Sequence, residues 1–154
     1  MNIESIADHL ELLPIIGKWH WDEWGHADPN GSVDTWTDGL RERILRDKVP
    51  TTYIALSDQS ELLGSVTLVD HDMDTHQELT PWLAGLYVSD EFRNLGIGSK
   101  LVNHAAEKAR RMGITKLFLY SSTAAGLYTK LGWQIVDEEF YEGEEVSVMV
   151  LNLT

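Results

Sequence analysis

The stretch Leu83-Ala84-Gly85-Leu86-Tyr87-Val88, followed after four residues by Arg93-Asn94-Leu95-Gly96-Ile97-Gly98, decides the fold of this chain. An apolar, strand-forming run leads into the glycine-rich beginning of an amphipathic helix. The first turn of a helix has unpaired N–H groups, and its dipole favours negative charge. Gly96 and Gly98 let a ligand approach the backbone closely. The pattern therefore predicts an anion site at this junction.

Two well-known phosphate motifs do not fit these residues. A P-loop needs Gly-Lys-Ser or Gly-Lys-Thr, whereas the order here is Gly98-Ser99-Lys100. The dinucleotide fingerprint needs a third glycine, and there are only two at this spacing. The remaining pattern, Arg-x-x-Gly-x-Gly, adds the planar donor fork of Arg93. By itself it is also compatible with glycines that only let a helix pack tightly on a strand.

The rest of the chain predicts one domain over residues 1–154, with helices first and a sheet afterwards. Ser5 is expected to cap a first helix. A strand–helix–strand unit between two hairpins predicts an α+β (mixed α/β) fold with one parallel strand pair. The expected helices are 6–13, 19–24, 33–47, 98–112 and 124–131, and the expected strands are 51–57, 62–69, 81–88, 115–120, 133–141 and 144–153.

Composition narrows the classes of function. The 154 residues include 12 Lys and Arg against 25 Asp and Glu, a formal net charge of −13. Proteins that bind nucleic acid or anionic membranes usually carry a basic patch, so neither partner is expected. The negative surface favours encounter with cations, although it also serves solubility. The absence of cysteine excludes disulfides and thiolate chemistry. Without a signal peptide or a long apolar run, a cytoplasmic location is expected.

A second motif points to a family. The segment Ala124-Ala125-Gly126-Leu127-Tyr128-Thr129-Lys130-Leu131-Gly132-Trp133 follows the anion loop after one helix and one strand. Together, the two motifs resemble the GCN5-related N-acetyltransferases, the GNAT family, over roughly residues 62–141. The resemblance implies a central, mostly antiparallel sheet with a splayed parallel strand pair, flanked by helices.

The resemblance also implies acetyl-CoA as co-substrate, with no metal. The pantetheine arm would pair with the strand backbone, and the glycine-rich loop would hold the pyrophosphate. A backbone N–H of Leu86 or Tyr87 would polarise the thioester carbonyl. Ser121 stands where the family often has an asparagine that contacts the cofactor. The implied cofactor-binding residues are Leu86, Tyr87, Val88, Arg93, Asn94, Leu95, Gly96, Ile97, Gly98, Ser99 and Ser121.

For catalysis, the family reaction is direct attack of a neutral amine on the thioester. Tyr128 matches the family tyrosine that protonates the leaving thiolate, although a packed tyrosine is the alternative. Glu78, at the entry to strand 81–88, is the expected base, because a protonated amine must lose a proton before it attacks. A solvated loop carboxylate is an equally open reading of Glu78, and His71 and His76 lie near it in sequence.

The acceptor site is expected at a tryptophan-rich segment, Lys18 to Trp24. Aromatic faces bind cations, and early helices cover the acceptor site in the family. We therefore assign Trp21, Trp24 and His76 to the acceptor, while core packing of each tryptophan stays open. The alternating aspartates Asp70 to Asp74 resemble an EF-hand, but position six is Thr75 instead of glycine and position twelve lacks glutamate. No metal site is expected.

These features predict an N-acetyltransferase that modifies a primary amine of a small cationic molecule. One alternative is an enzyme that acetylates a protein N-terminus or a lysine. A second is a non-catalytic acetyl-CoA-binding module, against which Tyr128 argues. A homodimer through the edge of the closing hairpin 133–153 is also considered.

Overall fold

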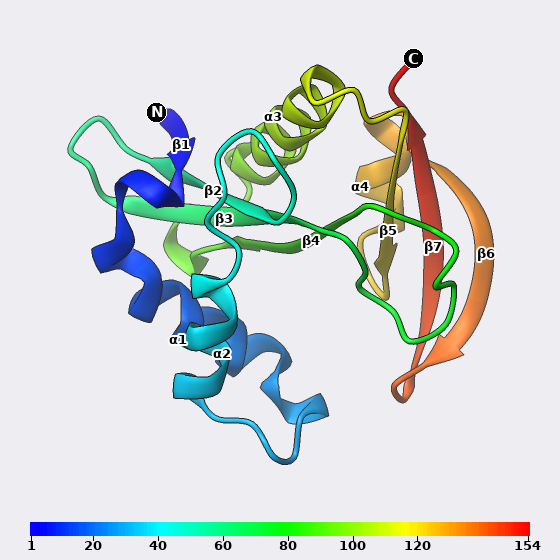
Figure 1. The fold of residues 1–154 in the computed structure, drawn as a ribbon, viewed down its shortest axis with the longest axis horizontal. Coiled ribbons are helices and arrows are strands. Elements are labelled where there is room, and N and C mark those ends of the chain that lie inside the picture. Colours follow the sequence, from blue (N-terminus) through cyan, green and yellow to red (C-terminus); the bar gives the residue numbers. More distant parts are fainter.

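The protein, described over residues 1–154 by a computed structural model, is built on one seven-stranded mixed sheet (Figure 1). The strand order is β1-β2-β3-β4-β5-β7-β6, and only β4 and β5 are parallel. This confirms the expected fold class. The strands are β1 (Asn2–Ser5), β2 (Thr51–Leu56), β3 (Leu62–Val69), β4 (Trp82–Val88), β5 (Lys116–Ser121), β6 (Gln134–Tyr141) and β7 (Glu144–Asn152).

Four α-helices cover the sheet on its two faces. The helices α1 (Leu13–Trp24) and α2 (Val33–Arg41) pack together below β1–β4 in Figure 1, whereas α3 (Ile97–Arg111) lies above them. The short helix α4 (Ala125–Lys130) lies beside β5 and β7. The predicted apolar stripe of α3 is confirmed, and its buried members are Ile97, Leu101, Val102, Ala105, Ala106 and Ala109.

The sheet divides into two parts that diverge between β4 and β5. In Figure 1 the strands β1–β4 run across the molecule, while β5, β7 and β6 stand steeply at its right-hand side. Three apolar clusters pack against the sheet, and two of them contain residues of both parts, so the parts share their core. One lies under α3, a second lies between the β3–β4 loop and β5–β7, and a third joins α1 and α2 to β2. The opening between the two parts lies at the parallel pair.

The N-terminal region differs from the sequence-based expectation. Asn2–Ser5 is an edge strand that pairs antiparallel with β2, and Ser5 caps only a 3-10 turn, accepting a hydrogen bond from the Ala7 N–H at 3.1 Å. The predicted helix 33–47 ends at Arg41. Strand β1 depends on a partner about fifty residues away, which local periodicity does not reveal.

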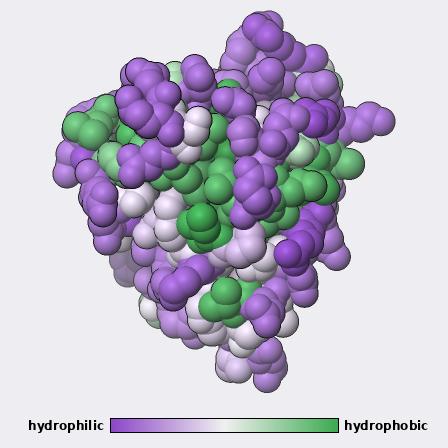
Figure 2. Space-filling view, turned by 90° about the vertical axis from the view of Figure 1, so that its left-hand side faces the viewer, coloured by the Kyte–Doolittle hydropathy of each residue, from purple (hydrophilic) through white to green (hydrophobic).

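An apolar surface crosses one side of the molecule. Figure 2 shows the side that carries the N-terminus and the β2–β3 turn, where hydrophobic residues form a band bordered by hydrophilic ones.

No helix in the structure has the length and apolar character needed to cross a membrane.

Candidate active site

The parallel strands β4 and β5 separate after a single paired position. Trp82 stands opposite Phe118, and the Phe118 N–H donates to the Pro81 carbonyl at 3.0 Å. Beyond this pair, β4 continues to Val88 without a partner on that edge. Its backbone from Leu86 to Val88 can therefore pair with an extended ligand, which would lie like an additional strand in the gap.

A β-bulge bends β4 at the centre of this open edge. Gly85 and Leu86 together stand opposite the single β3 residue Val66. Gly85 has a φ of +60°, and a Cβ there would lie 3.2 Å from Cε1 of His20. Both facts favour glycine at this position. The bulge changes the direction of the backbone at Leu86 and Tyr87, which are the residues expected to donate an N–H to an acyl oxygen.

The loop from Arg93 to Ser99 presents a row of unpaired backbone N–H groups. None of them donates to another backbone group, and the first bonded N–H is that of Lys100, to the Gly96 carbonyl at 3.2 Å. Asn94 and Gly96 have φ values of +65° and +81°, which curl successive N–H groups into a concave cradle. A Cβ on Gly98 would meet only one atom, at 3.7 Å. The cradle and the positive end of the α3 dipole fit a pyrophosphate.

The side chains of this loop contribute less than its backbone. Ile97 is buried in the core under α3, whereas Leu95 is 65% exposed. The Arg93 guanidinium folds back on the protein, with Nε donating to the Val88 carbonyl at 2.9 Å and Nη2 lying 3.0 Å from Asp90. It also stacks 5.4 Å from the centre of the Tyr87 ring. In this conformation, the anion-binding groups of the loop are chiefly backbone N–H groups.

Tyr128 lies in α4, the helix that follows β5, whereas the anion loop follows β4. Its side chain is buried and contacts the Trp133 ring edge-on, with centroids 6.0 Å apart. Burial raises the pKa of Tyr128 to about 12. The hydroxyl therefore keeps its proton at neutral pH, as a general acid must before it acts.

Ser121 ends β5 and begins the connection to α4. Its Oγ accepts a hydrogen bond from the Ala124 N–H at 2.9 Å. The hydroxyl therefore holds the turn that leads into α4, whose buried residue is Tyr128. This contact is a structural use of Ser121, additional to the cofactor contact expected from the sequence.

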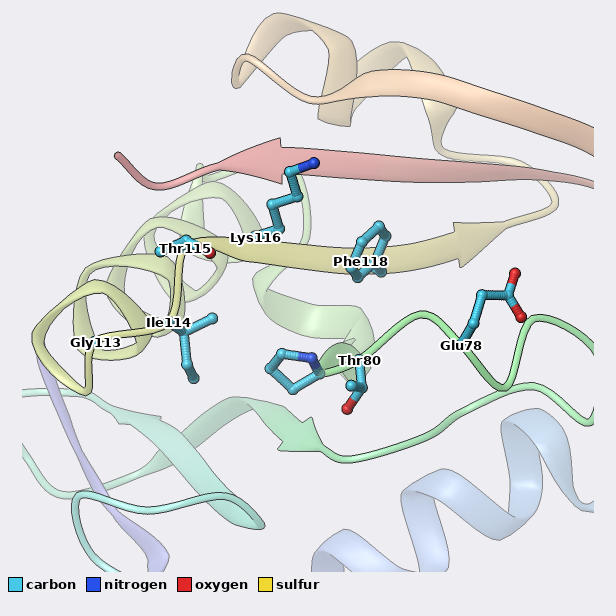
Figure 3. A pocket seen from close by; sticks show the side chains of 8 residues that line it. Glu78, Thr80, Gly113, Ile114, Thr115, Lys116 and Phe118 are labelled. Carbon is cyan, nitrogen blue, oxygen red and sulfur yellow. The ribbon is translucent and has the colours of Figure 1, made fainter.

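Glu78 lies in the β3–β4 loop, at one end of a shallow pocket of about 390 Å³. The pocket is also lined by Thr80, Pro81, Phe118 and residues 113–116, so it lies at the amino ends of the parallel strands. In Figure 3 the Glu78 carboxylate stands apart from the other lining side chains. The side chain is 71% exposed, and its Oε1 lies 3.6 Å from the His76 Nδ1. The structure thus separates Glu78 from the carboxyl end of β4, where the bulge and the anion loop lie.

Two tryptophans of α1 reach the bulge in β4. The rings of Trp19 and Trp24 lie 5.0 Å and 6.4 Å from that of Tyr87. Trp21 does not join them, because it points to α2 and contacts Trp36 edge-on at 6.0 Å. Sequence reasoning did not assign Trp19 to the site. The feature that could have indicated Trp19 is its position directly before His20, which is buried. Its ring lies against Tyr87 of β4.

His20 is a buried histidine between α1 and the bulge. Its Nε2 lies 3.0 Å from the Ser65 Oγ, which in turn donates to the Gly85 carbonyl at 3.1 Å. Burial, with a smaller contribution from Arg43, lowers the pKa of His20 to about 3. His20 is therefore neutral at physiological pH and fixes the bulge through hydrogen bonding.

Asp72 is a further residue that sequence reasoning did not single out. It is partly buried on the β3–β4 loop, and burial, strengthened by Glu142, raises its pKa to about 7 against the opposing effect of Arg43. The Asp72 charge also raises the pKa of Tyr120, near the end of β5, although burial is the main cause there. A carboxyl group with this pKa exchanges protons near neutral pH. In the sequence, Asp72 is distinguished only by its place in an acidic loop.

His76 meets two carboxylates of β6 rather than the tryptophans. Its Nε2 lies 3.3 Å from Asp137 Oδ2 and 3.2 Å from Glu139 Oε1. The Tyr141 hydroxyl accepts a hydrogen bond from the Asp74 N–H at 3.1 Å, so the β3–β4 loop is docked on β6 at two points. His76 therefore lies against the edge strand β6, which β7 separates from β5.

Comparison with known proteins agrees with this arrangement. The family model described as "Acetyltransferase (GNAT) family" matches residues 13–133. The uncharacterized protein YyaT of Bacillus subtilis (strain 168) is 29% identical over 151 residues, covering 92% of this chain and 88% of YyaT. The peptidyl-lysine N-acetyltransferase YjaB of Salmonella typhimurium is 28% identical over 96 residues, 61% of this chain and 59% of YjaB.

Solved structures share the fold at low sequence identity. The crystal structure of an aminoglycoside 6'-N-acetyltransferase complexed with coenzyme A superposes with a TM-score of 0.79 at 16% identity, over 100% of this chain and 98% of that one. The matched family model covers most of the chain, including both sequence motifs. The chain therefore belongs to the GNAT acetyltransferase family and is an N-acetyltransferase with acetyl-CoA as co-substrate.

Proposed function

We propose that this enzyme transfers the acetyl group of acetyl-CoA to a primary amine of a small cationic molecule. One observation carries the proposal: unpaired backbone N–H groups and a cluster of aromatic rings both lie next to the open stretch of β4. The anion loop beyond Val88 offers unpaired N–H groups. The rings are those of Trp19 and Trp24, and the β3–β4 loop adds the Asp72 carboxyl group. An anionic donor suits the N–H groups, and a cationic acceptor suits the rings and the carboxyl group.

On the donor side, most residues proposed to bind acetyl-CoA follow one another along the end of β4 and the loop into α3. Leu86, Tyr87 and Val88 would pair with the pantetheine arm, and the loop from Arg93 to Ser99 would hold the pyrophosphate. The whole chain carries a net charge of −13, which repels an anionic ligand at long range. Local N–H groups and the helix dipole of α3 therefore have to supply the attraction for the phosphates.

The chemistry proposed is a direct transfer. The amine nitrogen forms a bond to the thioester carbonyl carbon, and the carbon–sulfur bond breaks. An N–H of Leu86 or Tyr87 stabilises the negative charge that develops on the carbonyl oxygen. The Tyr128 hydroxyl protonates the departing thiolate, and a carboxylate takes the proton that the amine loses.

Two carboxylates compete for the role of base. Glu78 is the residue proposed from the sequence. Asp72 has the support of a pKa near 7 and of its position beside Tyr120, at the carboxyl end of β5. A base is most effective when its pKa is near the working pH, which favours Asp72. The pH dependence described in the Discussion separates the two.

A lysine side chain of a protein is the second candidate acceptor. The similarity to the peptidyl-lysine N-acetyltransferase of Salmonella typhimurium supports it. A lysine within a peptide is also a cationic primary amine, so the same aromatic rings could receive it. The two acceptors differ in size, because a peptide needs room on both sides of the reacting side chain.

The experiment that tests the proposal is acetyl-CoA turnover with a panel of amines, measured by release of free thiol. The panel contains a polyamine, an aminoglycoside, a neutral primary amine and a lysine-containing peptide. We expect the small polycations to have the highest kcat/KM. A peptide that exceeds them by tenfold or more would replace the small-molecule assignment, and binding of acetyl-CoA without turnover of any amine would contradict it.

A substitution at Trp24 tests the acceptor site itself. Loss of a cation–π contact worth about 0.5–2 kcal/mol raises KM about 2- to 30-fold. Trp24→Ala should therefore raise the KM of the acceptor by this factor and change the KM of acetyl-CoA less than twofold. Trp36→Ala is the matched control, since Trp36 contacts Trp21 away from Tyr87. Equal changes in both KM values would show that Trp24 acts through packing.

A further inference from the structure

The β3–β4 loop and β6 bring three potential metal ligands together outside the proposed catalytic groups. The ligand atoms of His76, Asp137 and Glu139 all lie within 4.8 Å of one another. His76 comes from the loop, while the two carboxylates stand two residues apart on β6. They are nearest neighbours on one face of the strand. Two like charges in this arrangement repel each other unless a cation lies between them.

The spacing of these atoms corresponds to a tetrahedral zinc ion. Zinc bonds of about 2.0–2.1 Å place neighbouring ligand atoms about 3.3–3.4 Å apart at the corners of a tetrahedron. The His76 Nε2 lies 3.3 Å from the Asp137 oxygen and 3.2 Å from the Glu139 oxygen. Two of the three edges thus already have this length, and the atoms of the third pair lie within 4.8 Å of each other.

The His76 ring nitrogen makes no hydrogen bond to either carboxylate. Its Nε2 atom is inaccessible to solvent and has no hydrogen-bond partner, although both oxygens are within 3.3 Å. The two oxygens therefore lie off the direction in which a ring N–H would point. A metal ion bound to Nε2 would lie along this direction, and its other ligands would lie to either side of it, as the two oxygens do. A buried polar atom left unpaired is costly, and a metal bond would remove this cost.

The surrounding residues supply the support that a zinc-binding histidine usually has. The Glu78 Oε1 lies 3.6 Å from the His76 Nδ1, on the opposite side of the ring from the two ligands. A hydrogen bond from this second ring nitrogen to a carboxylate orients the imidazole of a metal-bound histidine, and Glu78 is near enough to form one after a small approach. The Thr75 hydroxyl donates to Glu139 Oε1 at 3.1 Å and fixes that carboxylate.

We propose that His76, Asp137 and Glu139 bind one Zn²⁺ per chain, with water as the fourth ligand. Imidazole with two carboxylates is a suitable set for zinc, and a neutral histidine with two carboxylates balances the charge of the ion. The ion joins the β3–β4 loop to β6, and this loop carries Asp72 on the acceptor side. None of the three ligands takes part in the proposed acetyl-transfer step.

Zinc titration of the full chain, stripped of metal with a chelator, tests the proposal. Isothermal calorimetry with Zn²⁺ alone should show one equivalent bound. His76→Gln and Glu139→Gln should each weaken binding 100-fold or more. The matched controls are His71→Gln, a neighbouring histidine of the same loop, and Glu138→Gln, the carboxylate between the two ligands, and both should bind Zn²⁺ like the unaltered chain. Equal zinc affinity in His76→Gln and His71→Gln would overturn the site.

Two further measurements decide the result if a variant folds poorly. Zn²⁺ should raise the Tm of the unaltered chain and of His71→Gln, but leave that of His76→Gln unchanged. Co²⁺ should give the strong visible absorption of a tetrahedral site. Absence of a one-to-one zinc complex would overturn the site, and a loss of Tm in His76→Gln alone would then assign to His76 only a structural contact with the two carboxylates.

Discussion

At the residue scale, burial prepares two ionisable side chains for opposite tasks. Burial raises the pKa of Tyr128 to about 12, so the hydroxyl is protonated near neutral pH and can donate its proton as the carbon–sulfur bond breaks. Burial raises the pKa of Asp72 to about 7, so its carboxyl group can accept a proton near neutral pH. The same physical cause, loss of hydration of the charged form, thus favours an acid in one place and a base in another.

Removal of the Tyr128 hydroxyl should slow the reaction without disturbing the fold. Phenylalanine keeps the ring contact with Trp133. Because general acid catalysis contributes about 10²–10⁴-fold, kcat of Tyr128→Phe should fall by at least about 10²-fold. The KM of acetyl-CoA should stay within threefold in thiol-release assays. Tyr53→Phe is the control, since Tyr53 is equally buried with an unpaired hydroxyl in the core under α3. A loss of activity common to both variants would indicate packing.

The base can be identified from the pH dependence of kcat/KM. If Asp72 accepts the amine proton, the rate of the unaltered enzyme rises with pH through about 7, as Asp72 ionises. Asp72→Asn should lower the rate and remove this rise, whereas Glu78→Gln should leave the profile unchanged. The reverse result would assign the role to Glu78.

The raised pKa of Asp72 also predicts how the stability of the fold changes with pH. The folded-state pKa of Asp72, about 7, exceeds the ordinary value of 3.8. Its protonated form therefore favours the fold at low pH, and this contribution is lost as the pH rises from about 4 to about 7. Asp72→Asn should consequently have a higher Tm than the unaltered chain at pH 8, with the difference shrinking towards pH 4. A constant difference across this range would contradict burial of the charge.

At the element scale, the function depends on two interruptions of regular structure. The bulge at Gly85 re-aims the backbone of β4, and the loop before α3 curls its N–H groups into a cradle. Each needs a positive φ, at Gly85 and at Asn94 and Gly96, so the helical and strand patterns on either side cannot continue through them. The elements position the site, and the breaks between them supply its contacts.

A methyl group at Gly98 should separate cofactor binding from stability. Gly98 lies in the first turn of α3 with ordinary φ, and its Cβ would meet one atom at 3.7 Å, so Gly98→Ala should leave Tm unchanged or raise it slightly. The methyl group would project from the proposed pyrophosphate cradle and raise the KM of acetyl-CoA about tenfold or more, since close approach is lost. Gly39→Ala, in an equally open position of α2, is the control. An unchanged KM of acetyl-CoA would show that the pyrophosphate does not bind at this turn.

At the scale of the whole molecule, charge and sheet topology act together. The net charge of −13 gives the surface a negative potential that attracts a cationic acceptor and repels an anionic donor. The strands β4 and β5 diverge after the Trp82–Phe118 pair (Figure 1), and we propose that both substrates meet at the bulge in β4 beyond this pair.

Salt should therefore affect the two substrates in opposite ways. Raising the ionic strength screens the surface potential. The KM of a polycationic acceptor should increase severalfold, and that of acetyl-CoA should stay constant or decrease. A neutral amine in the same assay should show little change, which controls for general effects of salt on the enzyme. Parallel changes for charged and neutral amines would contradict electrostatic recognition.

Local sequence patterns were sufficient for most helices and strands and for the family. The strand at 62–69 was predicted with its observed bounds, and helix α3 and strand β5 within one residue, because hydrophobic periodicity and glycine placement are local properties. The two motifs around Gly96 and Tyr128 were sufficient to identify the donor. Local signals did not reveal β1 or the early end of α2, since β1 is stabilised by a partner distant in the chain.

Only the tertiary structure decided which side chains meet. It placed Trp19 on Tyr87 and turned Trp21 towards α2, a choice set by the packing of α1. It buried Asp72 and left Glu78 exposed, although both belong to one acidic loop. It also brought His76 to two carboxylates some sixty residues away. Burial and long-range proximity depend on how the two parts of the sheet diverge, and no local pattern in the sequence records that geometry.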